Sequence, residues 1–216
     1  MTPESPSLPA APVTRFIILA CILVELAFVL LPFPTDQRLA YVMALVPARL
    51  TLMPSSGAIT LVTSQFLHAG WFHLLANMVF LWAVGRPVEW VLGGRRFLIL
   101  YLLTGVLAGI LQTLVEPMST VPVVGASGAI SGMLAIYALL FSRSRVASRQ
   151  IAGIQVSGQV LRVLWFAAAW IGIQLMIAVI FNSGTMGVVA IWAHIGGFLA
   201  GLVLGIPFIR RKRQEG

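Results

Sequence analysis

Long apolar segments separated by short polar connections run through this sequence, and they restrict the folds open to it more than any other feature. Of the 216 residues, 59% are hydrophobic and 9% are charged, and the mean hydropathy is +0.99. A soluble domain carries roughly 25% charged residues, so this composition indicates a membrane protein. Because a spanning helix needs about 20 apolar residues, the chain has room for six spans in a single all-α bundle.

The apolar segments can be placed along the chain. We expect spanning helices over residues 16–33, 66 to about 86, 97–115, 127–141, 160–181 and 188–209. They form a six-span domain over residues 15–209. A disordered tail rich in Pro, Ser and Ala precedes it at residues 1–14, and a basic tail follows it at residues 210–216. The first run lacks an Ala-x-Ala-like cleavage site, which favours an uncleaved span over a signal peptide. The interrupted stretch 35–64 is typical of a loop lying in the membrane interface with a short amphipathic helix.

The arginines predict how the spans are oriented. The formal net charge is +8, and most of the basic residues follow spans two, four and six. The opposite connections hold only Arg38 and Arg49. Since cytoplasmic loops are enriched in Lys and Arg, both termini are expected in the cytoplasm. This bias accounts for the basic charge without nucleic-acid binding. Spans two, four and six then all begin on the outer side, at a similar depth.

Polar residues gather in the opening turns of those three spans. His68, His73 and Asn77 open span two, Ser127 begins span four, and His194 lies near the start of span six. Each of them alone is typical of helix packing or of hydrogen bonding between helices. Polar residues are costly inside a membrane, however, and independent packing residues need not share one depth. The set as a whole therefore indicates a functional site.

Glycines flank the serine and the last histidine at a spacing that suits close helix packing. They recur every fourth residue as Gly128 and Gly132 in span four, and as Gly197, Gly201 and Gly205 in span six. Such faces let two helix backbones approach closely. If the two faces meet, Ser127 and His194 come within reach of each other.

A serine beside a histidine supplies the parts of nucleophilic catalysis. Neutral imidazole can take the proton of a serine hydroxyl near pH 7. The backbone N–H of Ser127, at a helix start, together with Asn77 and His73, could donate hydrogen bonds to the oxyanion of a tetrahedral intermediate. The opening turns hold no Asp or Glu. The sequence therefore predicts a Ser127–His194 dyad without the acid of a full triad.

These motifs together resemble the rhomboid intramembrane serine proteases. The resemblance rests on the segment 66–77, on Gly125-Ala126-Ser127-Gly128 and on Ala193-His194-Ile195-Gly196-Gly197 with Gly201, and it covers about residues 15–208. It implies a six-span rhomboid-like bundle, with Ser127 as the nucleophile and His194 as its base. It also implies that His73 and Asn77 line the oxyanion hole. His68 would support the second span and the outer loop, and Glu89 would be a structural acid at the inner end of span two.

The chain departs from the pattern of many bacterial rhomboids at two places. Their outer loop carries a Trp-Arg pair, where this chain reads Ala58-Ile59-Thr60. Some also have a Tyr four residues after the nucleophile that stacks on the base, and here that residue is Ser131. Neither change removes a reacting group. Both bear on the rigidity of the loop and on the setting of His194, so no substrate preference follows from the resemblance.

The sequence thus predicts an intramembrane serine endopeptidase that acts on transmembrane substrates from within the lipid bilayer. By the same resemblance, it resides in a bacterial or archaeal plasma membrane with its site open to the outer side. One alternative is a non-proteolytic rhomboid-like protein that binds transmembrane helices. Another is a small transporter, but the chain lacks the repeated halves of many transporters. With a single cysteine, Cys21, and no cluster of metal ligands or nucleotide-binding loop, we expect no cofactor and no metal.

Overall fold

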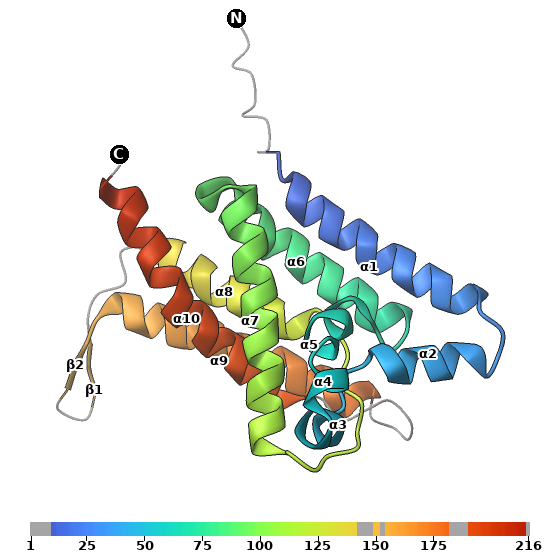
Figure 1. Cartoon of the computed structure of the whole chain (residues 1–216). Coiled ribbons are helices and arrows are strands. Elements are labelled where there is room, and N and C mark those ends of the chain that lie inside the picture. The colour runs from blue at the N-terminus through green and yellow to red at the C-terminus, as the bar shows by residue number, and fades with distance from the viewer. Residues whose placement is uncertain (1–9, 142–148, 152–153, 182–189, 215–216) are drawn as a thin grey trace, which may run out of the picture.

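The computed structural model describes residues 10–141, 149–151, 154–181 and 190–214. Six long helices correspond to the six predicted apolar segments, and Figure 1 shows them packed in one bundle. They are α1 (Pro12–Leu30), α6 (Trp71–Leu92), α7 (Gly94–Val115), α8 (Ser127–Phe141), α9 (Gly158–Phe181) and α10 (Ile191–Gln214). The predicted all-α architecture is therefore confirmed.

The number of membrane crossings stays a prediction. By length and apolar composition, three helical stretches of the described chain can cross a bilayer, namely Pro12–Leu30, Gly94–Val115 and Ile191–Phe208. A fourth is added if Pro54–Phe66 and Trp71–Leu92, bent by 79° at their junction, count as one broken span. Helix α8 has 15 residues and is about 22 Å long at 1.5 Å per residue. It is shorter than the roughly 30 Å hydrocarbon core.

Where the structure describes them, the two tails are shorter than predicted, because helices extend into both. Helix α1 begins at Pro12, three residues before the predicted boundary at Arg15. Proline suits the first turn of a helix because its fixed φ matches the helix and its missing N–H is not needed there. Helix α10 continues through residues 210–214. Residues 1–9 and 215–216, which complete the predicted tails, lie outside the described residues.

The connection between α1 and α6 is more helical than the single short helix predicted for it. It contains α2 (Thr35–Met43), α3 (Pro47–Leu52), α4 (Pro54–Gly57), α5 (Thr60–Thr63) and the 3-10 turn η1 (Ser64–Phe66). Two prolines of this stretch begin helices, since Pro47 and Pro54 are the first residues of α3 and α4. The structure corrects the prediction at this point.

A small antiparallel hairpin, which the sequence analysis did not predict, precedes α9. Its strands are β1 (Arg149–Ile151) and β2 (Ile154–Val156), and Gln150 pairs with Gln155. The β-branched residues Ile151, Ile154 and Val156 favour the extended conformation. The arginines at residues 143 and 145, used to predict orientation, lie outside the described residues.

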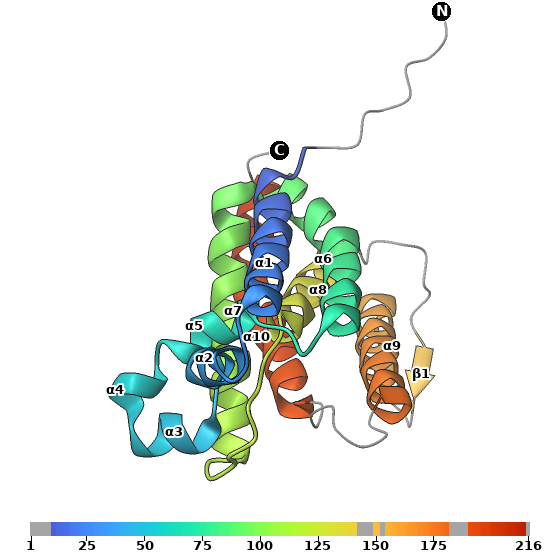
Figure 2. The same ribbon diagram turned by 90° about the vertical axis from the view of Figure 1, so that its right-hand side faces the viewer.

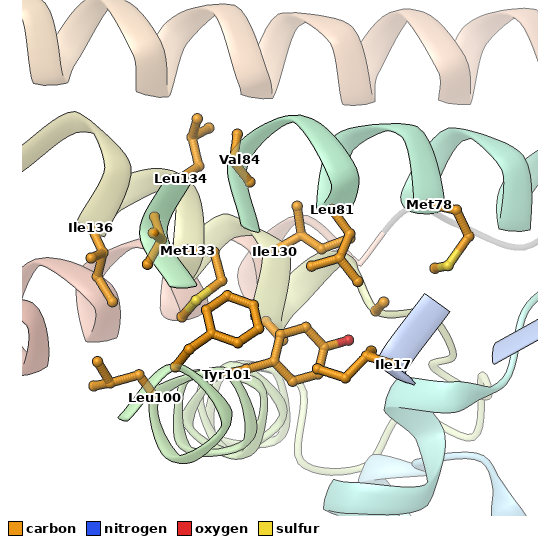
Figure 3. Close-up of a cluster of buried hydrophobic side chains, with 14 of the residues drawn as sticks. Ile17, Met78, Leu81, Val84, Leu100, Tyr101, Ile130, Met133, Leu134 and Ile136 are labelled. Carbon is orange, nitrogen blue, oxygen red and sulfur yellow. The ribbon is translucent and has the colours of Figure 1, made fainter. Parts of the chain in front are cut away.

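The core lies between α1, α6, α7 and α8, as Figure 3 shows. Its buried residues include Ile17 of α1, Leu81 of α6, Tyr101 of α7, and Ile130 and Met133 of α8. Helix α8 is buried on every side over residues 127–136, which is consistent with its nearly uniform apolar sequence. The helix that carries Ser127 is therefore the central element of the bundle.

The start of the first long helix and the end of the last one lie at the same end of the bundle, while their orientation in a membrane stays a prediction. Figures 1 and 2 show the start of α1 and the end of α10 at the same end of the molecule. Helices α6, α8 and α10 run in the same general direction, toward the end of the molecule where α1 starts. Their opening turns therefore lie at a similar level, where the predicted site residues are found.

Candidate active site

Ser127 and His194 lie within hydrogen-bonding distance. Ser127 is the first residue of α8. His194 lies in the first turn of α10, because α10 begins at Ile191 and not at the predicted residue 188. The Oγ of Ser127 is 2.7 Å from Nε2 of His194, although 67 residues separate them in the chain. Both side chains are buried, with exposed fractions of 9% and 5%. The imidazole is thus placed to accept the hydroxyl proton.

The two glycine faces predicted from sequence are in direct contact. A Cβ placed on Gly197 of α10 would collide with the carbonyl oxygen of Gly128 of α8. One turn further, a Cβ on Gly201 would lie 2.7 Å from the Cα of Gly132. Only hydrogen atoms fit between these backbones, and this close approach brings His194 to Ser127.

Helix α7 packs on a different side of α8, a contact that the sequence analysis missed. A Cβ on Gly128 would lie 2.7 Å from the Cβ of Ala108, and one on Gly132 would collide with Thr104. The Oγ1 of Thr104 also lies 3.4 Å from the carbonyl oxygen of Ala129. Thr104 and Ala108 are small residues four apart, so the same small-xxx-small pattern would have identified this face.

Gly125 shapes the loop that leads to Ser127. Its φ of +123° is one that residues with a side chain rarely adopt. Its backbone N–H donates to the carbonyl of Ser64, 3.0 Å away, which connects the loop to the start of η1. A Cβ on Gly125 would lie 2.9 Å from Cε1 of His73 and 3.6 Å from Oγ of Ser127. Both the strained φ and the narrow space therefore call for glycine at this position.

The ring of His73 is oriented by its own loop. The backbone N–H of Ala69 donates to Nδ1 of His73 at 3.2 Å, so in the neutral ring the proton resides on Nε2. Nε2 is the atom that a Cβ on Gly125 would approach to 3.0 Å. The Nε2–H group of His73 therefore points into the space beside Gly125 and Ser127.

Asn77 and His68 both lie next to His73. The Asn77 amide is buried and donates one N–H to the carbonyl of His73 at 3.0 Å, which leaves its second N–H for another acceptor. The ring of His68 meets that of His73 edge-on, with centroids 5.2 Å apart. The structure brings these three predicted residues together at the start of α6.

A hydrogen-bond network around Ser131 was missed by the sequence analysis. The indole Nε1–H of Trp170 in α9 donates to Oγ of Ser131 at 2.6 Å. The hydroxyl of Ser131 in turn donates to the carbonyl of Ser127 at 2.8 Å. The Trp170 ring also meets the His194 ring edge-on, with centroids 6.3 Å apart. Trp170 of α9 thus supplies an aromatic contact to His194. In some rhomboids this contact is made by a Tyr at the position that Ser131 occupies here.

Gln112 of α7 holds the first turn of α10, and this contact was also missed. Its Oε1 accepts the backbone N–H of Ala193 at 3.1 Å, and its Nε2 donates to Glu116 at 3.1 Å. Gln112 is 3% exposed. A buried amide in an otherwise apolar helix is costly without partners, and that cost is the signal that could have identified it. The contact fixes the backbone next to His194.

Glu89 lies away from the dyad and closes the start of α1. Its Oε1 accepts the N–H of Val13 at 2.9 Å, while Oε2 accepts both the N–H and the hydroxyl of Thr14 at 2.7 Å. No side chain of α1 caps this terminus. A carboxylate at a helix N-terminus satisfies free N–H groups and complements the helix dipole. Glu89 therefore joins the end of α6 to the start of α1.

Arg49 orders the long loop, which lacks the Trp-Arg pair. Its guanidinium donates to the carbonyls of Tyr41 and Ala44, and its Cζ lies 5.3 Å from the centre of the Tyr41 ring. The hydroxyl of Thr63 donates to the carbonyl of Met43 at 2.7 Å. These bonds connect α2, α3 and α5, so the loop has internal contacts of its own.

Comparison with known proteins identifies the family. Residues 55–211 match the rhomboid domain. The chain belongs to the rhomboid family. It is 37% identical over 145 residues, 66% of its length, to Rhomboid-like protein 11, chloroplastic, of Arabidopsis thaliana. It is 34% identical over 147 residues, 68% of its length, to Rhomboid protease GluP of Bacillus subtilis. It is also 31% identical over 147 residues, again 68% of its length, to Inactive rhomboid protein 1 of Papio anubis.

The comparisons confirm the family and the membrane class of this rhomboid protein. Family membership and the long apolar helices show an integral membrane protein. The matched regions make up 50%, 26% and 15% of the lengths of the three relatives. Because one relative is named a protease and another is named inactive, membership alone does not assign an activity.

Proposed function

We propose that this rhomboid protein is an intramembrane serine endopeptidase, which hydrolyses peptide bonds in or near transmembrane segments of membrane proteins. The observation that carries the proposal is the 2.7 Å contact between Oγ of Ser127 and Nε2 of His194. The packed glycine faces of α8 and α10 hold this pair in place, and so does Gln112, which accepts the backbone N–H of Ala193. A serine that served only for packing would not need an imidazole directed at its hydroxyl.

In the first half of the reaction, Oγ of Ser127 attacks the carbonyl carbon of the scissile bond while Nε2 of His194 takes its proton. The tetrahedral intermediate then collapses and the C–N bond breaks. His194 gives the same proton to the leaving amine, and an ester of Ser127 remains. Among the described residues no carboxylate is hydrogen-bonded to His194, so the proton moves within a two-residue system.

The oxyanion of the tetrahedral intermediate needs hydrogen-bond donors beside Ser127. Its backbone N–H is at the first position of α8, where a helix provides no internal acceptor. The Nε2–H of His73 points into the same space, across the bare Cα of Gly125. The second N–H of Asn77 lies one helical turn from His73. These groups form the proposed oxyanion hole.

In the second half, water attacks the ester carbon, His194 accepts a proton from that water, and the acid product leaves as Ser127 recovers its proton. Helices α6, α8 and α10 start on the side of the bundle away from the start of α1 and the end of α10 (Figure 1). With both termini in the cytoplasm, as the arginines predict, this side faces the outer surface of the membrane, and water enters the site from there. The proposed substrates are transmembrane proteins.

The competing function is a rhomboid protein that binds transmembrane helices without cutting them. To separate the two, membranes carrying the wild type, Ser127→Ala, His194→Ala and Ser56→Ala are treated with a fluorophosphonate probe and with a single-span model substrate. Ser56 is exposed in the long loop, so its variant is the matched control. We expect labelling and cleavage only in the wild type and in Ser56→Ala. Equal labelling or cleavage by Ser127→Ala would disprove the proposed mechanism.

A further inference from the structure

The imidazole of His194 needs an orienting group besides Ser127. In serine proteases with a triad, a carboxylate bonds the second ring nitrogen and fixes the orientation of the ring. Two of the described carboxylates form hydrogen bonds elsewhere. Glu89 accepts them at the start of α1, and Glu116 accepts one from Gln112. Rotation of the imidazole about its Cβ–Cγ bond would turn Nε2 away from Ser127. Packing around the ring has to prevent that rotation.

Trp170 is the aromatic side chain placed to do so. It is 3% exposed, and its ring meets that of His194 at 70°. Its indole is itself held from two sides. The Nε1–H donates to Ser131 in α8, and the ring meets Phe80 of α6 edge-on with centroids 4.6 Å apart. One side chain of α9 thus contacts α6, α8 and α10 at the level of the dyad.

We propose that Trp170 is a positioning residue for His194, which acts through its ring contact and through the Trp170–Ser131–Ser127 hydrogen-bond chain. This inference rests on the proposed function, since it concerns the same dyad. Ser131 lies one helical turn after Ser127 and donates to the Ser127 carbonyl. The same indole therefore sets the position of the imidazole relative to the backbone that carries the nucleophile.

Position 131 also explains why this contact can form. A serine there is small and is fully buried, and its hydroxyl can accept from the indole while donating to Ser127. An alanine would leave a buried indole N–H unpaired, which is unfavourable. Ser131 and Trp170 thus act as a pair, and a change in one should alter the effect of a change in the other.

The test compares Trp170→Leu, Trp170→Phe, Ser131→Ala and the Trp170→Phe/Ser131→Ala double variant. Trp165→Phe is the matched control, since Trp165 lies on the same helix with 67% of its surface exposed. The rate constant for fluorophosphonate labelling of Ser127 is measured with kcat and KM for a single-span substrate. Each value is normalised to folded protein in detergent. Labelling reports activation of Ser127 without a transmembrane substrate, so a residue needed only for substrate binding or for stability would leave it unchanged.

We expect Trp170→Leu to lower both the labelling rate and kcat by about 10²-fold, the effect of a misplaced catalytic pair, with KM nearly unchanged. Trp170→Phe keeps a ring but loses the donor, and should lower both by about fivefold, as for one neutral hydrogen bond. The double variant should lose less than the product of the two single losses. Trp165→Phe should match the wild type.

Wild-type labelling rates in both Trp170 variants would overturn this inference and leave the proposed function standing, provided that labelling requires Ser127. A loss of the same size in Trp165→Phe would overturn it as well. If Trp170→Leu does not fold, the labelling rate of Trp170→Phe decides the question. Failure of the wild type to label at Ser127 would instead remove the proposed function, and this inference with it.

Discussion

Gly197 of α10 lies directly against the carbonyl oxygen of Gly128 of α8, with no room for a Cβ between them. Gly201 meets Gly132 in the same way one turn further along. His194 precedes Gly197 by one turn of helix, and Gly128 follows Ser127. The geometry of the dyad therefore depends on the absence of side chains at these positions.

We accordingly expect Gly197→Leu and Gly201→Leu to inactivate the protein, although neither glycine takes part in the chemistry. A leucine would push α10 away from the backbone of α8, and a shift of about 1 Å in a catalytic pair can cost on the order of 10²-fold in rate. Cleavage of a single-span substrate and melting in detergent check this. Gly172→Leu is the control, since a Cβ there meets nothing within 4 Å. Normal activity and melting in both test variants would contradict the close-packing argument.

Asn77→Ala should lower cleavage by roughly 10²–10³-fold, the effect of removing one oxyanion donor in soluble proteases. The amide also donates to the carbonyl of His73, so part of the loss will come through the position of that ring. Labelling of Ser127 should persist at a reduced rate, because the nucleophile and its base remain. The comparison of cleavage and labelling rates checks this, and cleavage at the wild-type rate would make Asn77 a packing residue.

The sequence was sufficient for the long helices, for the family and for the pair of glycine faces. Apolar length determines where helices lie, and glycine spacing indicates where two of them meet, so the proximity of Ser127 and His194 followed from residues on two helices alone. The contacts of Trp170 and Gln112 could not be predicted in the same way. Each depends on the rotation and depth of a third helix, which its own nearly uniform apolar sequence does not specify.

The long loop was difficult for a related reason. Its short helices α3 and α4 are too short to be stable alone, and contacts such as those of Arg49 with the carbonyls of Tyr41 and Ala44 stabilise the loop. Such contacts join residues at irregular spacings in the sequence, so no periodic pattern predicts them. Proline signalled only a boundary, and the structure shows that the boundary is a helix start.

Gln112→Met should lower both activity and stability. The substitution preserves length and removes the oxygen that accepts the Ala193 N–H. A buried donor left without a partner costs about 1–3 kcal/mol, and the first turn of α10 can relieve that cost by shifting, which moves His194. We expect kcat to fall by about tenfold or more with lowered melting, in line with a displaced catalytic pair. Gln112→Met also removes the N–H that donates to Glu116, so Glu116→Gln is the control: it leaves the Gln112–Ala193 hydrogen bond in place and should keep nearly wild-type kcat. Equal losses of kcat in the two variants would mean that the hydrogen bond to Ala193 does not position His194.

Glu89→Gln should separate stability from catalysis, because Glu89 holds α1 and α6 together and makes no contact with the dyad. The carboxylate accepts three hydrogen bonds from Val13 and Thr14. The oxygen of the glutamine amide can keep the hydrogen bonds that one carboxylate oxygen accepts. Its NH₂ group then faces an N–H donor, and the negative charge at the start of α1 is lost. Loss of a helix N-cap costs about 0.5–2 kcal/mol, and an unpaired buried donor adds about 1–3 kcal/mol. Melting in detergent should therefore fall clearly, while the labelling rate of Ser127 per folded molecule should stay near the wild-type value well below the melting temperature. Thr14→Val removes only the hydroxyl bond and should lower melting by a smaller amount. A labelling rate reduced to the same degree as in Asn77→Ala would show that the start of α1 is coupled to the active site, and Glu89 would then have more than a structural role.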